Sequence, residues 1–152
     1  MAKEKSVKGG ARSSARLAAV QALYQIEASD TPSPIVIKEF VDHRLGELID
    51  DDQFAKADEA FFIDLVSGVD SRSEEIDELI TSNLTDSWSL ERIESVARAV
   101  LRSGVYEILA RPDVPTNVII NEYVDVTKAF FDDSTPAFVN GILDKIAKLT
   151  RE

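Results

Sequence analysis

Basic residues gather at the start of the chain, where they could bind phosphate groups. Five of the 17 basic residues lie among the first 16 positions: Lys3, Lys5, Lys8, Arg12 and Arg16. Glu4 is the one acidic residue there, so this segment carries +4, whereas the remaining 12 basic and 27 acidic residues give the rest of the chain −15. Arg12 and Arg16 flank the expected start of a helix, where the helix dipole disfavours cations by roughly 0.3–1 kcal/mol. With the N–H groups of the first helical turn they would bind phosphate instead.

Two other interpretations of this segment stay open. A basic N-terminal tail can simply make the chain more soluble, because runs of charge are weak motifs on their own. Arg16 can also pair with a carboxylate of the acidic body, since the chain holds 28 acidic residues.

A second candidate site follows from the stretch STPAFVNGILDKI, residues 134–146. Its apolar residues recur at helical spacing and predict a core face: Val139, Ile142, Leu143, Ile146 and Leu149. At 100° per residue, Ala137, Gly141, Lys145 and Lys148 fall together on another face, about 260° to 340° from Phe138, which lies at the boundary. Two lysines, two minimal side chains and an aromatic edge suit a partner whose backbone comes close and a base that stacks on the ring. Alternatively, Gly141 admits a neighbouring helix and Phe138 is a core residue.

Residues for catalysis or metal binding do not form a recognisable set. The chain has no cysteine, and its one histidine, His43, has no evident partner. The acidic runs 50–52 and 132–133 fall at expected helix ends and are interpreted as solvated termini. No glycine-rich phosphate loop, nucleophile elbow or zinc-protease motif is present. We therefore expect no catalytic residue, no cofactor and no metal, and an enzyme built on paired carboxylates remains as the alternative.

Length and hydropathy favour a folded domain. The chain has 152 residues, of which 44% are hydrophobic, enough for a core. No apolar run of about 18 residues predicts a membrane span, and the first residues lack the apolar region of a secretory signal. The cytoplasm is the expected location.

Helical periodicity runs through the chain, and no segment alternates with period two. Helices are expected at about 13–27, 35–49, 56–69, 74–84, 90–111, 118–130 and 135–149. Their expected caps are Ser13 or Ser14, a capping box from Ser71 to Glu74, Ser89, and Thr135 followed by Pro136. The sequence therefore predicts an all-α bundle of about seven helices behind a flexible basic arm, residues 1–11.

Several strings resemble the NusB family. ARSSARLAAVQALYQIE (11–27) is similar to the first helix of that family, with its Arg-rich start and Gln-Ala-Leu-Tyr run. RPDVPTNVIINEYVDVTKAF (111–130) and FVNGILDKIAK (138–148) resemble its C-terminal half, and LVSGV (65–69) and VLRSGVYEIL (100–109) stand where similar strings are expected. The resemblance implies a compact NusB-like bundle of two small helical subdomains, here one all-helical domain over residues 12–152.

The resemblance also implies a function, which is binding without catalysis. Members of the family are transcription antitermination factors that pair with NusE, a small-subunit ribosomal protein. The heterodimer binds the boxA element of nascent ribosomal RNA and promotes processive RNA synthesis, so other elongation factors and RNA polymerase are indirect partners. Some members self-associate, and the sequence leaves a homodimer open.

Single-stranded RNA is read by stacking of splayed bases on aromatic rings and by backbone contacts. Carried over to this chain, the resemblance implies five RNA-binding residues: Arg12, Arg16, Tyr24, Phe138 and Asn140. Lys8 and Lys145 are expected to add weaker electrostatic contacts to the RNA. The chain departs from the family where Ser13 and Ser14 follow Arg12 and where Ala137 precedes Phe138. Each change removes a phosphate contact, so we expect weak RNA binding without the partner. A helical adaptor that binds only protein is the alternative function.

Overall fold

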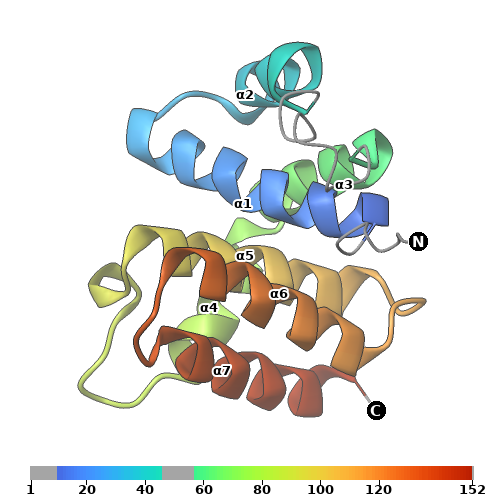
Figure 1. Ribbon diagram of the computed structural model, residues 1–152. Helices are drawn as coiled ribbons and strands as arrows, with labels where there is room; N and C mark the ends of the chain where they lie inside the picture. The colour runs from blue at the N-terminus through green and yellow to red at the C-terminus, as the bar shows by residue number, and fades with distance from the viewer. Residues whose placement is uncertain (1–9, 46–56, 152) are drawn as a thin grey trace. The chain divides into compact units, whose positions relative to one another are not determined.

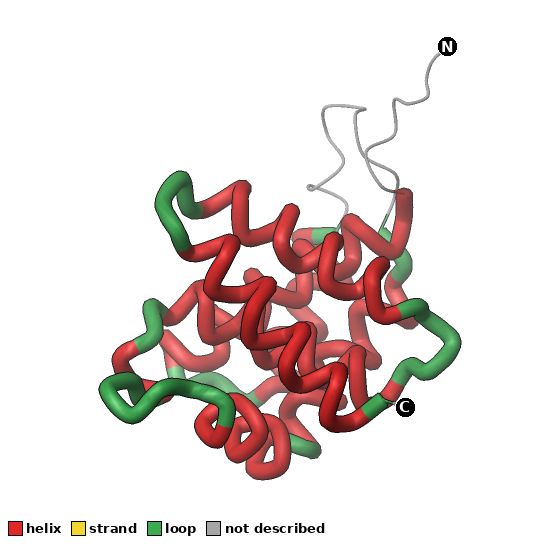
Figure 2. The backbone as a smooth tube through the Cα atoms, turned by 90° about the horizontal axis from the view of Figure 1, so that it is seen from below, coloured by secondary structure: helices red, strands yellow, loops and turns green. Residues whose placement is uncertain are grey.

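Helices make up most of the residues that the structure describes. The computed structural model describes residues 10–45 and 57–151, and within these ranges seven α-helices and no strand are found (Figures 1 and 2). The chain divides into two units, residues 1–68 and 69–152. The prediction of an all-α fold of about seven helices in two small subdomains is confirmed. Among the described residues, no helix is long and apolar enough to cross a membrane.

The first unit is built on α1 (Gly10–Ser29). It also contains α2 (Ser33–Glu39), which continues into the π-helical turn η1 (Phe40–Arg44), and most of α3 (Glu59–Ser71), which runs across the boundary between the units. The rings of Phe40 and Phe62 stack with centroids 5.6 Å apart and so join η1 to α3. The start of α3 is tied to α1 by a hydrogen bond from Asp58 N to Ala11 O, 3.0 Å long.

The second unit contains α4 (Ser73–Ser82), the 3₁₀ turn η3 (Leu90–Arg92), α5 (Ser95–Ala110), α6 (Thr116–Phe130) and α7 (Thr135–Thr150). Helices α5, α6 and α7 lie side by side and share a core (Figure 1). Helices α5 and α7 approach each other closely at Gly104, because a Cβ on this residue of α5 would lie only 3.0 Å from Leu143 Cδ2 of α7. Tyr123 of α6 donates a hydrogen bond of 2.9 Å to the buried Glu107 Oε1.

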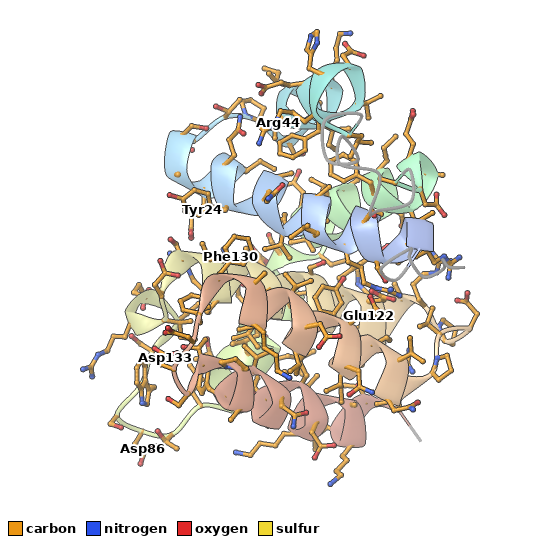
Figure 3. All side chains as sticks on the ribbon, viewed as in Figure 1. Tyr24, Arg44, Asp86, Glu122, Phe130 and Asp133 are labelled. Atoms are coloured by element: carbon orange, nitrogen blue, oxygen red, sulfur yellow. The ribbon has the colours of Figure 1, made fainter. Side chains whose placement is uncertain are left out.

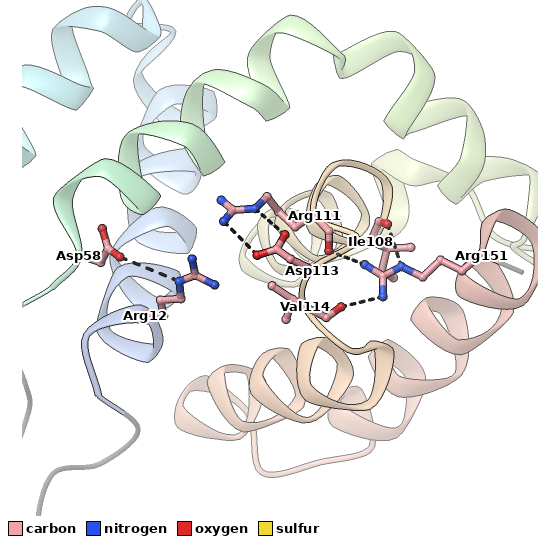
Figure 4. Close-up of polar contacts among 7 residues, drawn as sticks. All are labelled: Arg12, Asp58, Ile108, Arg111, Asp113, Val114 and Arg151. Atoms are coloured by element: carbon pink, nitrogen blue, oxygen red, sulfur yellow. Dashed lines mark hydrogen bonds and ion pairs between the residues drawn. The ribbon is translucent and has the colours of Figure 1, made fainter.

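Arg151 fastens the end of α7 to the connector between α5 and α6 (Figure 4). Its guanidinium donates to Ile108 O at 3.0 Å, Arg111 O at 2.8 Å and Val114 O at 2.8 Å. A further hydrogen bond of 3.0 Å reaches Thr116 Oγ1. Carbonyls at and beyond the end of a helix have no hydrogen-bond donor within that helix. The Arg151 side chain thus donates to three such carbonyls at the end of α5 and in the connector after it.

Helix boundaries depart from the sequence prediction in the first unit. Helix α1 begins at Gly10, three residues before the expected start, so Ser13 and Ser14 lie inside the helix and the prediction that one of them is its N-cap is wrong. Residues 1–9 of the predicted basic arm lie outside the described residues. The helix expected over 35–49 is α2 followed by the π-helical turn, where Leu45 N bonds to Phe40 O. The last part of that expected helix, with the acidic run 50–52, also lies outside the described residues.

The helix expected over 90–111 is interrupted, and its predicted cap is wrong. Ser89 precedes only the short turn η3, and α5 begins at Ser95 after Glu94, whose side chain accepts from Val96 N at 2.8 Å. Arg98 stabilises the non-helical backbone between η3 and α5, because its Nη1 donates to Leu90 O at 3.2 Å and to Ile93 O at 2.5 Å. Leu90 O also accepts from Ile93 N at 3.2 Å, which closes the 3₁₀ turn, and Arg98 binds the carbonyls on both sides of the break.

Two other predicted caps are also wrong. The N-cap of α4 is Arg72, with no hydrogen bond from a capping side chain, so the Ser71–Glu74 box does not open this helix. Arg72 instead donates to Glu75 at 3.0 Å. Helix α7 has Ser134 as N-cap, one residue before the predicted Thr135, and the side chain that accepts from Thr135 N is Asp133, at 2.9 Å.

Asp133 predicts a pH dependence of stability. The carboxyl of Asp133, which is labelled in Figure 3, is exposed. The hydrogen bond from Thr135 N holds the pKa of this carboxyl below its ordinary value. A lowered folded-state pKa stabilises the protein above the unfolded pKa, and this contribution is lost as the pH falls through the folded value. We expect Asp133→Ala to lower the free energy of unfolding at neutral pH, by an amount that shrinks below pH about 4. Urea denaturation over a pH series measures it; Asp132→Ala, which removes the same charge one residue earlier, should lack this pH-dependent difference.

Candidate nucleic-acid interface

Two arginines of α1 share one aromatic ring. The guanidinium carbon of Arg12 lies 4.7 Å from the centroid of the Phe61 ring, and that of Arg16 lies 5.1 Å from it. Arg12 also faces Asp58, with 4.0 Å between Nε and Oδ2 (Figure 4). Its side chain is 43% exposed, and a surface pair of this length contributes little to stability. Arg16 differs, since only 3% of it is exposed.

The other predicted residues of the N-terminal region are placed differently. Tyr24 lies three turns further along α1 than Arg12, and 42% of it is exposed (Figure 3). Its ring is therefore available for stacking. Lys8 lies outside the described residues. On α1 itself, an exposed cation and an exposed ring are thus about 18 Å apart along the helix axis.

The second unit places Phe138 beside an aromatic ring that sequence analysis overlooked. Phe138 is half-buried on α7, and its ring centroid lies 6.1 Å from that of Trp88, at an interplanar angle of 36°. The guanidinium of Arg92 lies over the indole of Trp88 at 5.5 Å. A pocket of about 270 Å³ opens here, which we call the Trp88 pocket. Its lining includes Trp88, Arg92, Glu94, Ser134, Thr135 and Phe138.

One sequence signal could have pointed to this pocket. Trp88 is the only tryptophan of the chain, and it occurs in the polar turn TDSWS, where no helix needs its side chain for a core. The pairing with Phe138 could not have been predicted, because 50 residues separate the two rings in the sequence and helical periodicity gives no long-range contacts.

Asn140 does not share the Trp88 pocket. It is exposed on α7 and lines a separate open hollow of about 490 Å³ between α6 and α7. Two residues along a helix turn the side chain by about 200°, so Phe138 and Asn140 point to different sides. The predicted site residues of α7 therefore form two groups, with Lys145 on the side of Phe138.

The face of α7 that carries Ala137, Phe138, Gly141, Lys145 and Lys148 is called here the α7 stripe. A Cβ placed on Gly141 would meet no described atom within 4 Å, so the alternative that Gly141 admits a neighbouring helix finds no support in the described residues. Gly104 has that role instead. Lys145 is exposed and forms no ion pair with a described residue, whereas Lys148 pairs with Asp144 at 3.1 Å. The stripe thus offers an open, cationic surface.

Gly141→Ala should change the stability of the protein and its affinity for RNA in opposite directions. Because nothing opposes the added methyl group, we expect the free energy of unfolding to rise by roughly 0.5–1 kcal/mol. If a nucleic-acid backbone approaches the stripe closely, the same methyl group should weaken RNA binding. Urea denaturation and RNA titration of one preparation measure both effects. Stabilisation without any loss of RNA affinity would show that no ligand backbone comes close to Gly141.

Comparisons with known proteins agree with the resemblance in the sequence. The sequence model of the NusB family matches residues 13–148. Transcription antitermination protein NusB of Sphingopyxis alaskensis is 51% identical over 141 residues, which cover 93% of this chain and 95% of that protein. The protein of the same name from Caulobacter vibrioides is 50% identical over the same shares of the two chains.

Solved structures share the fold. NusB of T. maritima has a TM-score of 0.71 and 34% sequence identity, and the match covers 90% of both chains. A chain in the crystal structure of antitermination factors NusB and NusE in complex with dsRNA has a TM-score of 0.73 and 26% identity, over 90% of this chain and 96% of that one. Sequence and structure therefore agree that the chain belongs to the NusB family, the family of the transcription antitermination proteins NusB.

Proposed function

We propose that the chain is a transcription antitermination factor that pairs with NusE and binds single-stranded boxA-type RNA of nascent ribosomal transcripts. The observation that carries the proposal is the match, over 90% of the chain, to a chain of the NusB–NusE complex with dsRNA. Binding keeps RNA polymerase and its other elongation factors in processive synthesis, in the cytoplasm and without a chemical step catalysed by this chain.

Single-stranded RNA is favoured over a duplex by the rings that the chain exposes. Tyr24 and Phe138 can stack only on bases that are splayed out of a helix. Arg12 and Lys145 are exposed cations that can follow the backbone, and Lys8 would add a third from the basic arm over residues 1–11. Asn140 can bond to a base edge on the other side of α7. Arg16 is buried against Phe61, so we assign it to holding that ring, over which Arg12 also lies.

Charge makes the partner necessary for tight binding. The chain has a net charge of −11, and Ser13, Ser14 and Ala137 stand where the family can supply phosphate-binding side chains. An acidic body attracts a basic ribosomal protein, which then contributes cationic contacts to the RNA. The isolated chain should therefore bind RNA weakly and with a shallow dependence on salt.

The proposal is tested by measuring the affinity of boxA-type RNA with and without NusE, at several salt concentrations. We expect much tighter binding and a steeper salt dependence with NusE. A scrambled single strand and a duplex of the same sequence serve as controls and should bind more weakly. Equal and tight binding with and without NusE would contradict the expectation that NusE supplies the cationic contacts that this chain lacks. Binding of NusE without any RNA would favour the helical adaptor instead.

A further inference from the structure

The Trp88 pocket shares Phe138 with the RNA-binding set that the sequence implies, but Trp88 and Arg92 do not belong to that set. Trp88 is 46% exposed although it is the largest apolar side chain of its loop. A single exposed apolar residue needs no explanation, but this one contacts Phe138 and borders a hollow. The combination of two rings and a cavity is that of a ligand site.

The loop that carries Trp88 is held in place by hydrogen bonds. Trp88 N donates to Thr85 O at 3.0 Å, and Arg92 Nη1 donates to Ser87 O at 2.6 Å. Arg98 fixes the following turn through Leu90 O and Ile93 O. The indole is therefore presented by a preformed backbone, which lowers the entropy that a ligand must overcome on binding.

The charges around the pocket suit an anion next to a planar ring. Arg92 is exposed, and no carboxylate of the described residues pairs with it. One of its five donors is used at Ser87 O, and the others can reach a phosphate. Glu94, the acidic residue in the lining, accepts from Val96 N and so is engaged at the start of α5. The hydroxyls of Ser134 and Thr135 add donors and acceptors at the rim.

The size of the pocket limits what it can hold. Its 270 Å³ is below the roughly 300–1,000 Å³ typical of sites for drug-sized ligands. The 6.1 Å between the two rings is also too short for a ligand between them, because two layers of contact at about 3.5 Å each need about 7 Å. A single planar group must instead stack on the exposed part of the indole, beside the edge of Phe138.

We propose that the Trp88 pocket binds one unpaired nucleobase of single-stranded RNA, with Arg92 bound to a phosphate of the same nucleotide. This inference rests on the proposed function and extends it by two residues, Trp88 and Arg92. A base that stacks on the Trp88 indole explains why this ring is exposed. The guanidinium of Arg92 explains why a nucleotide would bind in preference to an uncharged aromatic group.

The single tryptophan makes a direct test possible. Full-length chain labelled with fluorotryptophan gives one fluorine NMR signal, from Trp88, which is titrated with boxA-type single-stranded RNA with and without NusE. We expect a saturable shift of this signal at the RNA concentrations at which an independent filter-binding assay shows complex formation. A series of RNAs with one abasic position each should contain one position whose loss abolishes the shift.

Variants measure the contribution of each side chain. Trp88→Ala should weaken RNA binding by roughly 5- to 150-fold, whereas Trp88→Phe, which keeps a ring, should retain most of the affinity. Arg92→Gln should weaken binding and reduce the salt dependence by about one phosphate contact. Arg44→Gln is its matched control, because it removes the same charge and a similar cation–ring contact, over Phe40 at 4.5 Å. Circular dichroism confirms that each variant is folded; if Trp88→Ala is not, Arg92→Gln and the abasic series decide.

The outcomes separate this inference from the proposed function. RNA that binds without shifting the Trp88 signal, or equal losses for Arg92→Gln and Arg44→Gln, would overturn the inference and leave the function intact. A shift caused by NusE alone and not by RNA would assign the pocket to a protein partner and also overturn it. RNA that fails to bind even with NusE would overturn the proposed function and this inference with it.

Discussion

Phe138→Ala is expected to weaken the binding of single-stranded RNA by roughly 5- to 150-fold, because base–aromatic stacking contributes about 1–3 kcal/mol per base. Phe138 is half-buried on α7 and contacts Trp88, so its loss removes one ring and also a support of the second. RNA titration in the presence of NusE measures the change. The affinity for NusE is measured in parallel, since the proposal requires it to stay the same.

Phe130→Ala provides the matched control for Phe138→Ala. Phe130 belongs to the same unit, lies at the end of α6, and is 43% exposed (Figure 3). Both substitutions remove a phenyl ring from a partly exposed position. We expect Phe130→Ala to leave RNA affinity within about two-fold, because surface substitutions away from a site have small effects. Equal losses in the two variants would show that a general disturbance of the helices, and not stacking on Phe138, lowers the affinity.

Arg151→Ala is expected to lower the free energy of unfolding by about 2–4 kcal/mol, since hydrogen bonds to a charged group contribute roughly 1.5–3 kcal/mol each and are not fully additive. The substitution leaves the carbonyls of Ile108, Arg111 and Val114 without this partner. Urea denaturation followed by circular dichroism measures the loss. Arg151→Lys should recover only a small part of it, because an ammonium group cannot reach acceptors spread around a planar guanidinium.

Lys148→Ala tests whether the effect of Arg151→Ala comes from hydrogen bonds or from charge. Lys148 lies on the same helix, carries the same charge and pairs with Asp144 at the surface. Exposed pairs of this spacing contribute only about 0.3–0.5 kcal/mol. A loss for Arg151→Ala as small as that for Lys148→Ala would show that the contacts of the guanidinium are not important for folding.

The positions of the helices were largely predictable from the sequence, and their interruptions were not. Apolar residues such as Val139, Leu143 and Ile146 recur at helical spacing, and the structure buries all three on one face of α7. The break before α5 depends on Arg98, whose side chain reaches backwards to carbonyls five and eight residues earlier. A periodic pattern contains no information about such bonds, so the pattern predicts one long helix from Leu90.

The candidate site was predictable only in part for a similar reason. The α7 stripe followed from helix geometry, and the structure leaves Gly141 and Lys145 exposed as expected. Whether an arginine is exposed or buried depends on tertiary contacts, which is why Arg12 and Arg16 could not be distinguished before the ring of Phe61 was located. Trp88 was overlooked because its partner in the fold lies on a distant helix.

The close approach of Gly104 to Leu143 has a consequence for how this protein can evolve. It restrains the packing of α7 on α5, because even a methyl group at Gly104 would lie 3.0 Å from Leu143 Cδ2. The exposed residues Ala137 and Lys145 lie on another face of α7, so we expect substitutions there to change the affinity for a ligand with little effect on stability. Selection can thus act on recognition and on foldability through separate sets of positions on one helix.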